Sequence, residues 1–130
     1  MLDTRRTANS KELPTDSVFS AVRKYNVGIF GIKPFADNAL FKGDSTPNSP
    51  FKEEDSTRAR LALRYILGNP AVTAPIAGLV TMEQVDNAAR AIMERRKLDH
   101  AEGAHLEKAT RHMWANLRPS HRWLRDWEYV

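Results

Sequence analysis

Apolar residues recur at helical spacing in four stretches of the chain, and this pattern predicts four helices. The predicted helices cover residues 15–26, 55–67, 81–93 and 100–117. Glycine or proline follows several of them, as is typical where a helix stops. The faces predicted to be buried consist of Val18, Phe19 and Val22; of Ala59, Ala62, Leu63, Ile66 and Leu67; of Met82, Val85, Ala89, Ile92 and Met93; and of Leu106, Ala109, Met113, Trp114 and Leu117.

Two shorter apolar runs lie between the first three predicted helices. Residues 27–32 are apolar at every position, and residues 71–76 form a second run that contains Pro75. An unbroken apolar run is typical of a strand that is buried on both faces, as in a parallel sheet. Strands that alternate with helices in this order predict an α/β fold. Because two strands alone leave uncovered edges and faces, we expect them to pair with further strands.

The remaining segments are polar or aromatic. Residues 1–13 are predicted to be a disordered leader, and residues 33–55 form a long loop of the kind that is functional or mobile. The C-terminal residues Trp123, Trp127 and Tyr129 are expected to pack and anchor the chain end. The predicted organisation is thus a leader at 1–13, an α/β part at 14–98, and a helical extension with an aromatic tail at 99–130.

The composition narrows the class of protein. The chain has 130 residues, of which 42% are hydrophobic and 28% charged, a mix typical of globular domains. It contains no cysteine, which excludes disulfides, cysteine-ligated metals and thiol nucleophiles. No apolar run approaches the ~20 residues that cross a bilayer, and residues 1–10 lack the apolar centre of a signal peptide. We therefore expect a cytoplasmic protein with no membrane partner.

Charge and histidine content add two negative expectations. The net charge is +4, but lysine and arginine are interleaved with acids along the whole chain. Because phosphate-backbone binding needs clustered basic residues, we expect no nucleic-acid partner. The four histidines lie in the C-terminal region without the spacing of a zinc site, so we expect solvated helix faces and no metal. They are His100, His105, His112 and His121.

Two places in the sequence are candidates for ligand binding. The turn at 77–81 joins a predicted strand to a helix whose Thr81 and Gln84 have capping-box spacing. Backbone N–H groups at such a terminus attract an anion, and Gly78 lets the backbone approach it, although an ordinary strand-to-helix turn has the same pattern. Lys33 follows the first strand, where ligands collect in α/β folds; a lysine extending into solvent is the alternative interpretation.

Three blocks of the chain, in this order and spacing, resemble the C-terminal part of an aldo-keto reductase. VGIFGIKPF at 27–35 is similar to the seventh barrel strand and its exit loop. ALRYILGNPAVT at 62–73 is similar to the seventh helix and its continuation into strand eight, and PIAGLVTMEQV at 75–85 to the last strand and the helix behind it. The resemblance covers about residues 15–97. It implies NAD(P)H-dependent reduction of aldehydes or ketones in a (β/α)8 TIM barrel. The α/β part of this chain would then correspond to about the last two βα units of the barrel.

The resemblance also implies cofactor-binding roles for nine residues. The expected cofactor is NADP, with NAD as the alternative, bound only in the context of a complete barrel. Gln84 stands where NADPH-preferring members often have arginine, and Asn87 lies beside the positions that contact adenine, one of which is Ala88 here. The implied pyrophosphate and nicotinamide contacts are Lys33, Pro34 and Phe35; the implied contacts to the adenosine phosphate are Gly78, Leu79, Val80 and Thr81.

No catalytic residue is assigned. In the family that the chain resembles, the catalytic Asp, Tyr, Lys and His come from early barrel strands that have no counterpart in this sequence. We therefore expect a fragment that has no reductase activity as an isolated chain. The alternative hypothesis is a non-catalytic half-barrel that self-associates, or docks on a partner chain, through its exposed strand edges.

Overall fold

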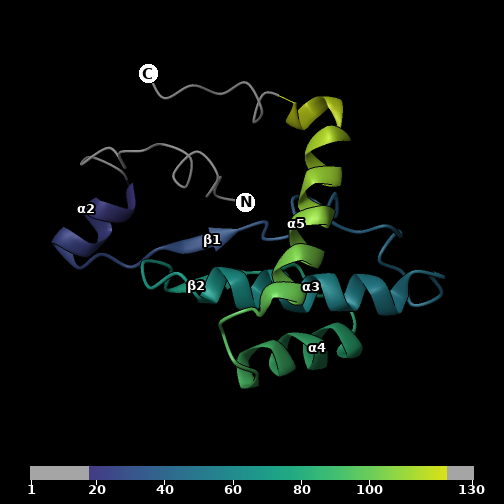
Figure 1. Cartoon of the computed structure of the whole chain (residues 1–130), viewed down its shortest axis with the longest axis horizontal. Helices are drawn as coiled ribbons and strands as arrows, with labels where there is room; N and C mark the ends of the chain where they lie inside the picture. Colours follow the sequence, from purple (N-terminus) through teal and green to yellow (C-terminus); the bar gives the residue numbers. More distant parts are fainter. Residues whose placement is uncertain (1–17, 123–130) are drawn as a thin grey trace.

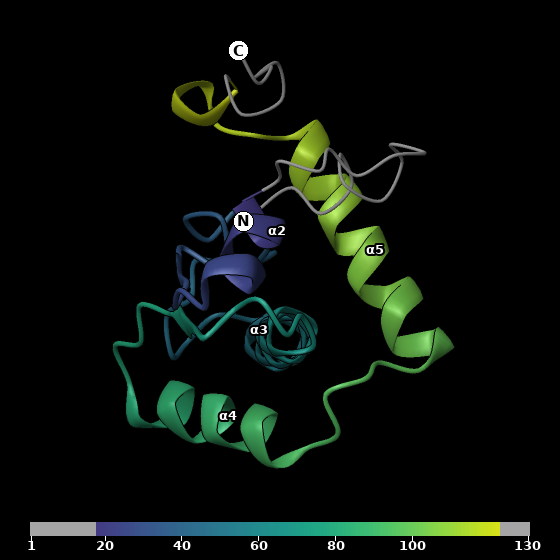
Figure 2. The same ribbon diagram turned by 90° about the vertical axis from the view of Figure 1, so that its left-hand side faces the viewer.

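Helix α3 is the centre of the fold. The computed structural model describes residues 18–122. In Figure 1, α4 runs alongside α3 and α5 crosses it; Figure 2 looks along α3, with the two strands, α4 and α5 arranged around it. In chain order the elements are α2 (Val18–Tyr25), β1 (Phe30–Ile32), α3 (Lys52–Leu67), β2 (Ala74–Ile76), α4 (Met82–Met93), α5 (His100–Ala115) and the 3-10 helix η1 (Pro119–His121).

Short-range signals set the ends of the helices. Gly68 caps α3, and its N–H donates to the carbonyls of the last turn. At the start of α4 the Thr81 hydroxyl accepts a hydrogen bond from the Gln84 N–H. Helix α5 begins with a full capping box, in which Asp99 and Glu102 each accept from the other's backbone N–H. The predicted helix ends at Gly68 and Thr81 are therefore confirmed. The predicted start of α2 lies outside the described residues, as do the leader and the three tail aromatics.

The hydrophobic core lies between helices. Leu61, Ala62 and Leu63 of α3 are buried against α4 and α5, and the loop after β1 contributes Phe35 and Leu40. Burying side chains of this size is the main favourable term in folding. The predicted buried face of α5 is confirmed by Leu106, Ala109, Met113 and Leu117, with Trp114 partly buried beside them; Ala91 of α4 completes the cluster.

The two strands form a small parallel sheet with one uncovered face. Phe30 pairs with Ala74 and Ile32 with Ile76. Because side chains alternate across a strand, these residues share one face. That face is turned away from α3: Phe30, Ile32 and Ile76 are 64%, 67% and 54% exposed. The parallel direction was expected from the element order, but the prediction that the run at 27–32 is buried on both faces is wrong.

The expected fold class is also wrong. The described residues contain four α-helices and only a two-stranded sheet with three residues per strand, and they do not form a TIM-barrel fragment. In a barrel, the strands form the core and the helices cover it. Here α3 packs mainly on α4 and α5, so helix-to-helix contacts form the core and the sheet lies at its margin. The two apolar runs suggested a larger buried sheet, but each forms a strand of only three residues.

Helix α4 presents the opposite face to the one predicted. Met82 and Met93, from its apolar stripe, are 71% and 87% exposed, and Val85 and Ile92 are exposed as well. The fully buried residue is Ala91, with Ala88 partly buried beside it. Small side chains let two helices approach closely, so α4 packs on α3 through its alanines. The longer apolar side chains are left on the surface.

Candidate functional site

A pocket of about 150 Å³ lies between the loop after β1 and the first turns of α3 and α4. The loop contributes one wall, α3 the floor, and the turn from β2 into α4 the other wall. The lining residues are Phe35, Asn38, Phe41, Ser45, Thr46, Pro47, Ser49, Lys52, Asp55, Ser56, Ala59, Leu63, Gly78, Leu79, Val80, Thr81, Glu83, Gln84, Asn87 and Ala88.

Seven of the nine residues nominated from the sequence line this pocket. The other two do not: Pro34 is buried beneath the loop, and Lys33 is exposed with a φ of 53°. A positive φ is uncommon for a residue with a Cβ. Lys33 follows β1 directly and does not line the pocket. The seven lining residues are Phe35, Gly78, Leu79, Val80, Thr81, Gln84 and Asn87.

Gln84 connects three segments of the pocket wall. Its Oε1 accepts from the Val80 N–H at 2.8 Å, and its Nε2 donates to the Ser45 carbonyl at 3.3 Å. Both ends of the amide are thus used within the protein. The sequence suggested a cofactor contact at this position; in the structure its side chain holds the loop against the start of α4.

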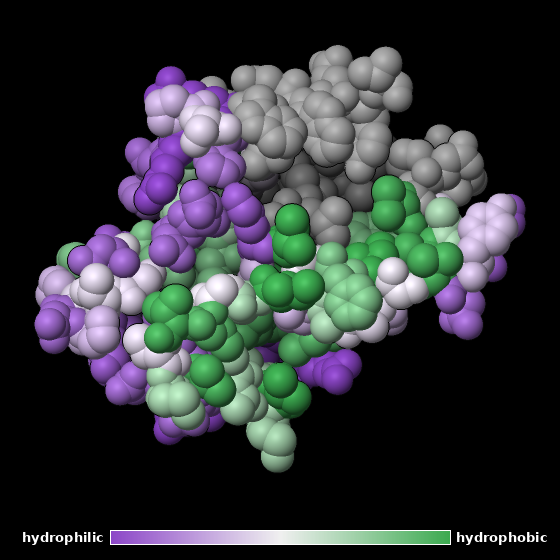
Figure 3. Space-filling view, turned by 180° about the vertical axis from the view of Figure 1, so that it is seen from behind, coloured by the Kyte–Doolittle hydropathy of each residue, from purple (hydrophilic) through white to green (hydrophobic). Residues whose placement is uncertain are grey.

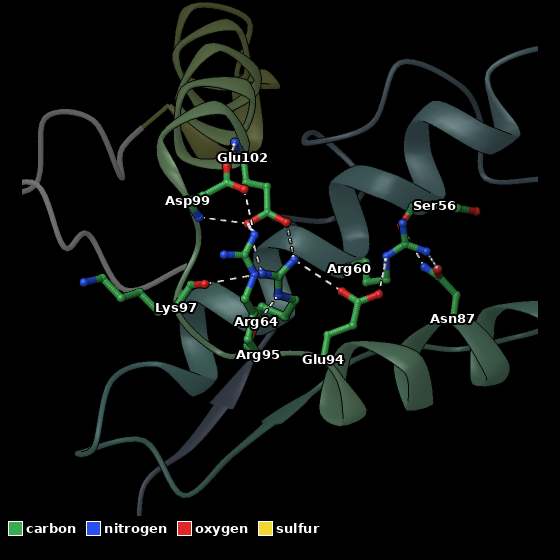
Figure 4. Close-up of polar contacts among 9 residues, drawn as sticks. All are labelled: Ser56, Arg60, Arg64, Asn87, Glu94, Arg95, Lys97, Asp99 and Glu102. Carbon is green, nitrogen blue, oxygen red and sulfur yellow. Dashed lines mark hydrogen bonds and ion pairs between the residues drawn. The ribbon is translucent and has the colours of Figure 1, made fainter.

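Asn87 joins α4 to α3 in a similar way. Its Nδ2 donates to the Ser56 carbonyl at 2.8 Å, and its Oδ1 accepts from Arg60 at 3.3 Å, as Figure 4 shows. Arg60 also pairs with Glu94 farther along α4. Since the amide of Asn87 is satisfied on both sides, its side chain positions the two helices that form the pocket.

The loop that forms the first wall has an unusual backbone. Ala36, Asp37 and Asn38 have successive positive φ values of 50°, 57° and 65°, and Ser45 has a φ of 64°. Asp and Asn tolerate this region, but Ala36 and Ser45 adopt it only at a cost, so the surrounding contacts must hold the loop in place. One such contact is the buried Asp55 carboxylate of α3, which accepts from the Lys42 and Gly43 N–H groups at 2.8 and 2.9 Å.

The pocket has unfilled hydrogen-bonding capacity and free space. The Ser45 hydroxyl oxygen is buried and has no hydrogen-bond partner among the described residues. An added Cβ at Gly78 would meet no atom within 4 Å. Phe35 and Phe41 pack in a tilted arrangement, with their ring centres 5.1 Å apart and an angle of 44° between the ring planes, and provide an apolar end. These features fit a small ligand that is apolar at one end and able to form hydrogen bonds at the other.

The pocket is not strongly cationic. Lys52 is its one basic residue, against the acids Asp55 and Glu83. The pKa of Glu83 is lowered from its usual 4.5 by its own backbone N–H, by the Thr81 hydroxyl and by the charge of Lys52. Lys52 and Glu83 could not be singled out from the sequence, since each is an ordinary charged residue in the first turn of a helix. The Ser- and Pro-rich loop had been singled out, but only for its length.

Among the described residues, no group of three His, Asp or Glu side chains is placed to hold a metal ion. No described helix is both long enough and apolar enough to cross a membrane. Comparison of the chain with models of protein families, with curated proteins and with solved structures finds no match.

Proposed function

We propose that the pocket binds the adenosine end of a nicotinamide dinucleotide. The observation that carries this proposal is the gathering of seven nominated cofactor residues around one pocket. Four of them, Gly78 to Thr81, are neighbours in sequence, but Phe35 is contributed by a loop some forty positions earlier. Because β1 and β2 pair in parallel, the segments that follow them, with Phe35 and Gly78, lie at the same edge of the sheet.

The chemistry of the lining supports a nucleoside. Phe35 and Phe41 offer aromatic surface for a base, and the Ser45 hydroxyl offers a buried polar group. Open space next to Gly78 leaves the turn accessible to a ligand. Pockets for small molecules are typically apolar with a few polar groups that fix orientation, and this pocket has that composition.

The reaction that such binding would serve is NAD(P)H-dependent carbonyl reduction. Among the described residues, no tyrosine or histidine lines the pocket, so a carbonyl oxygen would find no usual proton donor there. We therefore expect binding without turnover by this chain alone. The absence of cysteine is compatible with the reducing cytoplasm, where we place the protein.

A titration with NAD⁺, NADP⁺ and AMP, followed by calorimetry, tests the proposal. We expect saturable binding of at least one of them with one site per chain. Gly78→Ala should weaken the binding, because the added methyl group meets no protein atom and would occupy space that the ligand needs beside the turn. The matched control is Gly31→Ala, where a Cβ also meets nothing within 4 Å but which does not line the pocket. No binding of any of the three, or equal loss in both variants, would contradict the proposal.

The uncovered sheet face supports a second candidate function, self-association without catalysis. Phe30, Ile32 and Ile76 share that face, and within residues 18–122 each strand is paired along one edge only. In Figure 3, apolar side chains gather on the side of the molecule opposite to that of Figure 1. Contiguous exposed apolar surface is typical of an interface.

Light scattering of the purified chain tests this second function. Self-association through the sheet predicts a dimer mass that Ile32→Lys reduces to a monomer. Met93→Lys is the control, because Met93 is apolar and even more exposed but belongs to α4. A monomer at all concentrations, or a dimer that both variants break equally, would argue against the sheet as the interface.

A further inference from the structure

The small sheet and helix α4 each have an apolar face that stays exposed among the described residues. The sheet face consists of Phe30, Ile32 and Ile76, each more than half exposed. The face of α4 is its apolar stripe, which is exposed along its whole length and consists of Met82, Val85, Ala89, Ile92 and Met93. The two faces are complementary in kind, because parallel sheets in α/β folds are covered by helices on both sides.

Within one chain the two faces cannot meet. Helix α4 packs on α3 through its opposite side, where Ala91 is fully buried and Asn87 donates to the Ser56 carbonyl. The sheet also lies against α3, and its apolar face is turned away from that helix. Figure 3 shows apolar side chains spread over one side of the molecule, across the sheet and α4. Only a second molecule can therefore bring a helix to the sheet face.

We propose that two copies of the chain form a dimer in which the α4 stripe of each copy packs on the sheet face of the other. The dimer rests on the second candidate function, self-association through the sheet, and names the element that covers the sheet. A two-fold axis makes the contact reciprocal, since each residue that meets a partner residue is met by it in turn. Two such contacts bury twice the apolar surface of one, which favours a dimer built on so small a sheet.

The size of the sheet limits how much of α4 it can cover. A strand of three residues is about 10 Å long, and the same length of helix holds about seven residues. The face therefore accommodates two turns of α4, which has 12 residues. Met82, Val85 and Ala89 lie in the first two turns, whereas Met93 is the last residue of the helix.

The charges beside the two faces favour the first two turns. Lys33 is exposed and follows β1 directly, so it lies at the rim of the sheet face. Asp86 is exposed in the second turn of α4 and has the opposite charge. The last turn contains Arg90, and Arg96 follows the helix; both would repel Lys33. The contact therefore brings Asp86 of one copy to Lys33 of the other and leaves Met93 outside.

Sedimentation equilibrium of the wild-type chain and of surface variants tests this arrangement. We expect wild type to be a dimer, and Ile32→Lys and Ala89→Lys to be monomers at the same concentration, because each variant places a charge in both contacts. Met93→Lys is the matched control on the same helix and should remain a dimer. A dimer that survives Ala89→Lys overturns the α4 contact and leaves self-association through the sheet in place.

A charge exchange tests the same contact without changing any apolar side chain. Lys33→Glu and Asp86→Lys should each raise the dissociation constant of the dimer about tenfold, since each turns an attraction into a repulsion twice per dimer. The double variant should return to the wild-type value, and this recovery also shows that the variants fold. A double variant no tighter than the single ones overturns the contact. A wild-type monomer at every concentration, or a dimer that survives Ile32→Lys, overturns self-association through the sheet and this contact with it.

Discussion

The guanidinium of Arg64 on α3 holds the Glu102 carboxylate of α5 in a two-point contact. The two N–H···O distances are 2.8 and 3.0 Å, and the Arg64 side chain is almost fully buried. Arg64 also donates to the Arg95 carbonyl at 2.7 Å and pairs with Glu94 at the end of α4. Figure 4 shows these contacts converging on one side chain. Arg64 thus ties α3 to the end of α4, the connecting segment and the start of α5.

Arg64→Ala should lower the free energy of unfolding by about 3 kcal/mol, because it removes a buried guanidinium and leaves the Arg95 carbonyl and the partly exposed Glu102 and Glu94 carboxylates without their donor. Urea denaturation measures the change. Arg111→Ala is the control: Arg111 pairs with Glu107 on the exposed face of α5, and such a pair contributes only about 0.5 kcal/mol. Similar losses in the two variants would show that Arg64 does not organise the fold.

Acid should destabilise the protein between about pH 5 and pH 3. Hydrogen bonds from Arg64 and from the Asp99 N–H lower the pKa of Glu102 from its usual 4.5, and the Glu102 N–H and Arg95 lower the pKa of Asp99 from 3.8. A carboxyl with a lower pKa in the folded state takes up its proton more readily when unfolded. The carboxyl contributes fully to the free energy of unfolding when the pH is above its pKa in the unfolded state. This contribution is lost as the pH falls through its pKa in the folded state.

Urea denaturation at a series of pH values checks this dependence. Glu102→Gln should flatten the decline below pH 5, because its side chain no longer titrates. Glu107→Gln removes a carboxyl from the same helix whose pair with Arg111 is exposed, and the decline should stay closer to that of wild type. Stability that is constant or rises between pH 5 and pH 3 would contradict the proposed role of these carboxylates.

Two glycine-to-alanine variants should change stability in opposite directions. At Gly103, inside α5, an added Cβ meets no atom within 4 Å, so Gly103→Ala should stabilise by about 0.5–1 kcal/mol through helix propensity. At Gly43 a Cβ would collide with the Ser49 hydroxyl and lie 2.9 Å from an Asp55 oxygen, so Gly43→Ala should destabilise. Thermal melting of both variants measures the difference. The same sign in both would contradict the described packing of the loop.

Asp55→Ala should loosen the loop over the pocket. The buried carboxylate is the acceptor for the Lys42 and Gly43 N–H groups, and leaving them unpaired costs on the order of 1–3 kcal/mol. Limited proteolysis should then cut within residues 42–50 sooner than in wild type. Asp86→Ala, at an exposed position of α4, should be cut at the wild-type rate. Unchanged cleavage in Asp55→Ala would mean that other contacts hold the loop.

The sequence was informative where the determinants are local. Gly68 ends α3 and Thr81 caps α4 because caps act within one turn of their own helix. The grouping of Gly78 to Thr81 around the pocket follows for the same reason, since these residues form one turn. Their contribution to a site could therefore be expected from their order alone, without knowledge of the rest of the fold.

Features that depend on distant partners could not be predicted. Arg64 sits among the apolar residues of α3, and its main partner Glu102 lies 38 positions later. The stripe of α4 was assigned to the core because apolar spacing reveals a face but not what covers it; Ala91 packs on α3 instead, and the longer side chains remain outside. Gln84 and Asn87 donate hydrogen bonds to the carbonyls of Ser45 and Ser56. These partners are distant in sequence, so the two contacts could not be predicted either.

The small sheet has a consequence for the order in which the chain folds. Ile29 and Thr73, whose contact adjoins the paired strands, are 44 positions apart, and α3 lies between them. Closing so long a loop costs conformational entropy. Two strands of three residues each form few hydrogen bonds to offset that cost. We therefore expect the strands to meet after α3 has formed and packed, and the sheet to open before the helical core; amide hydrogen exchange should then be faster in the strands than in α3.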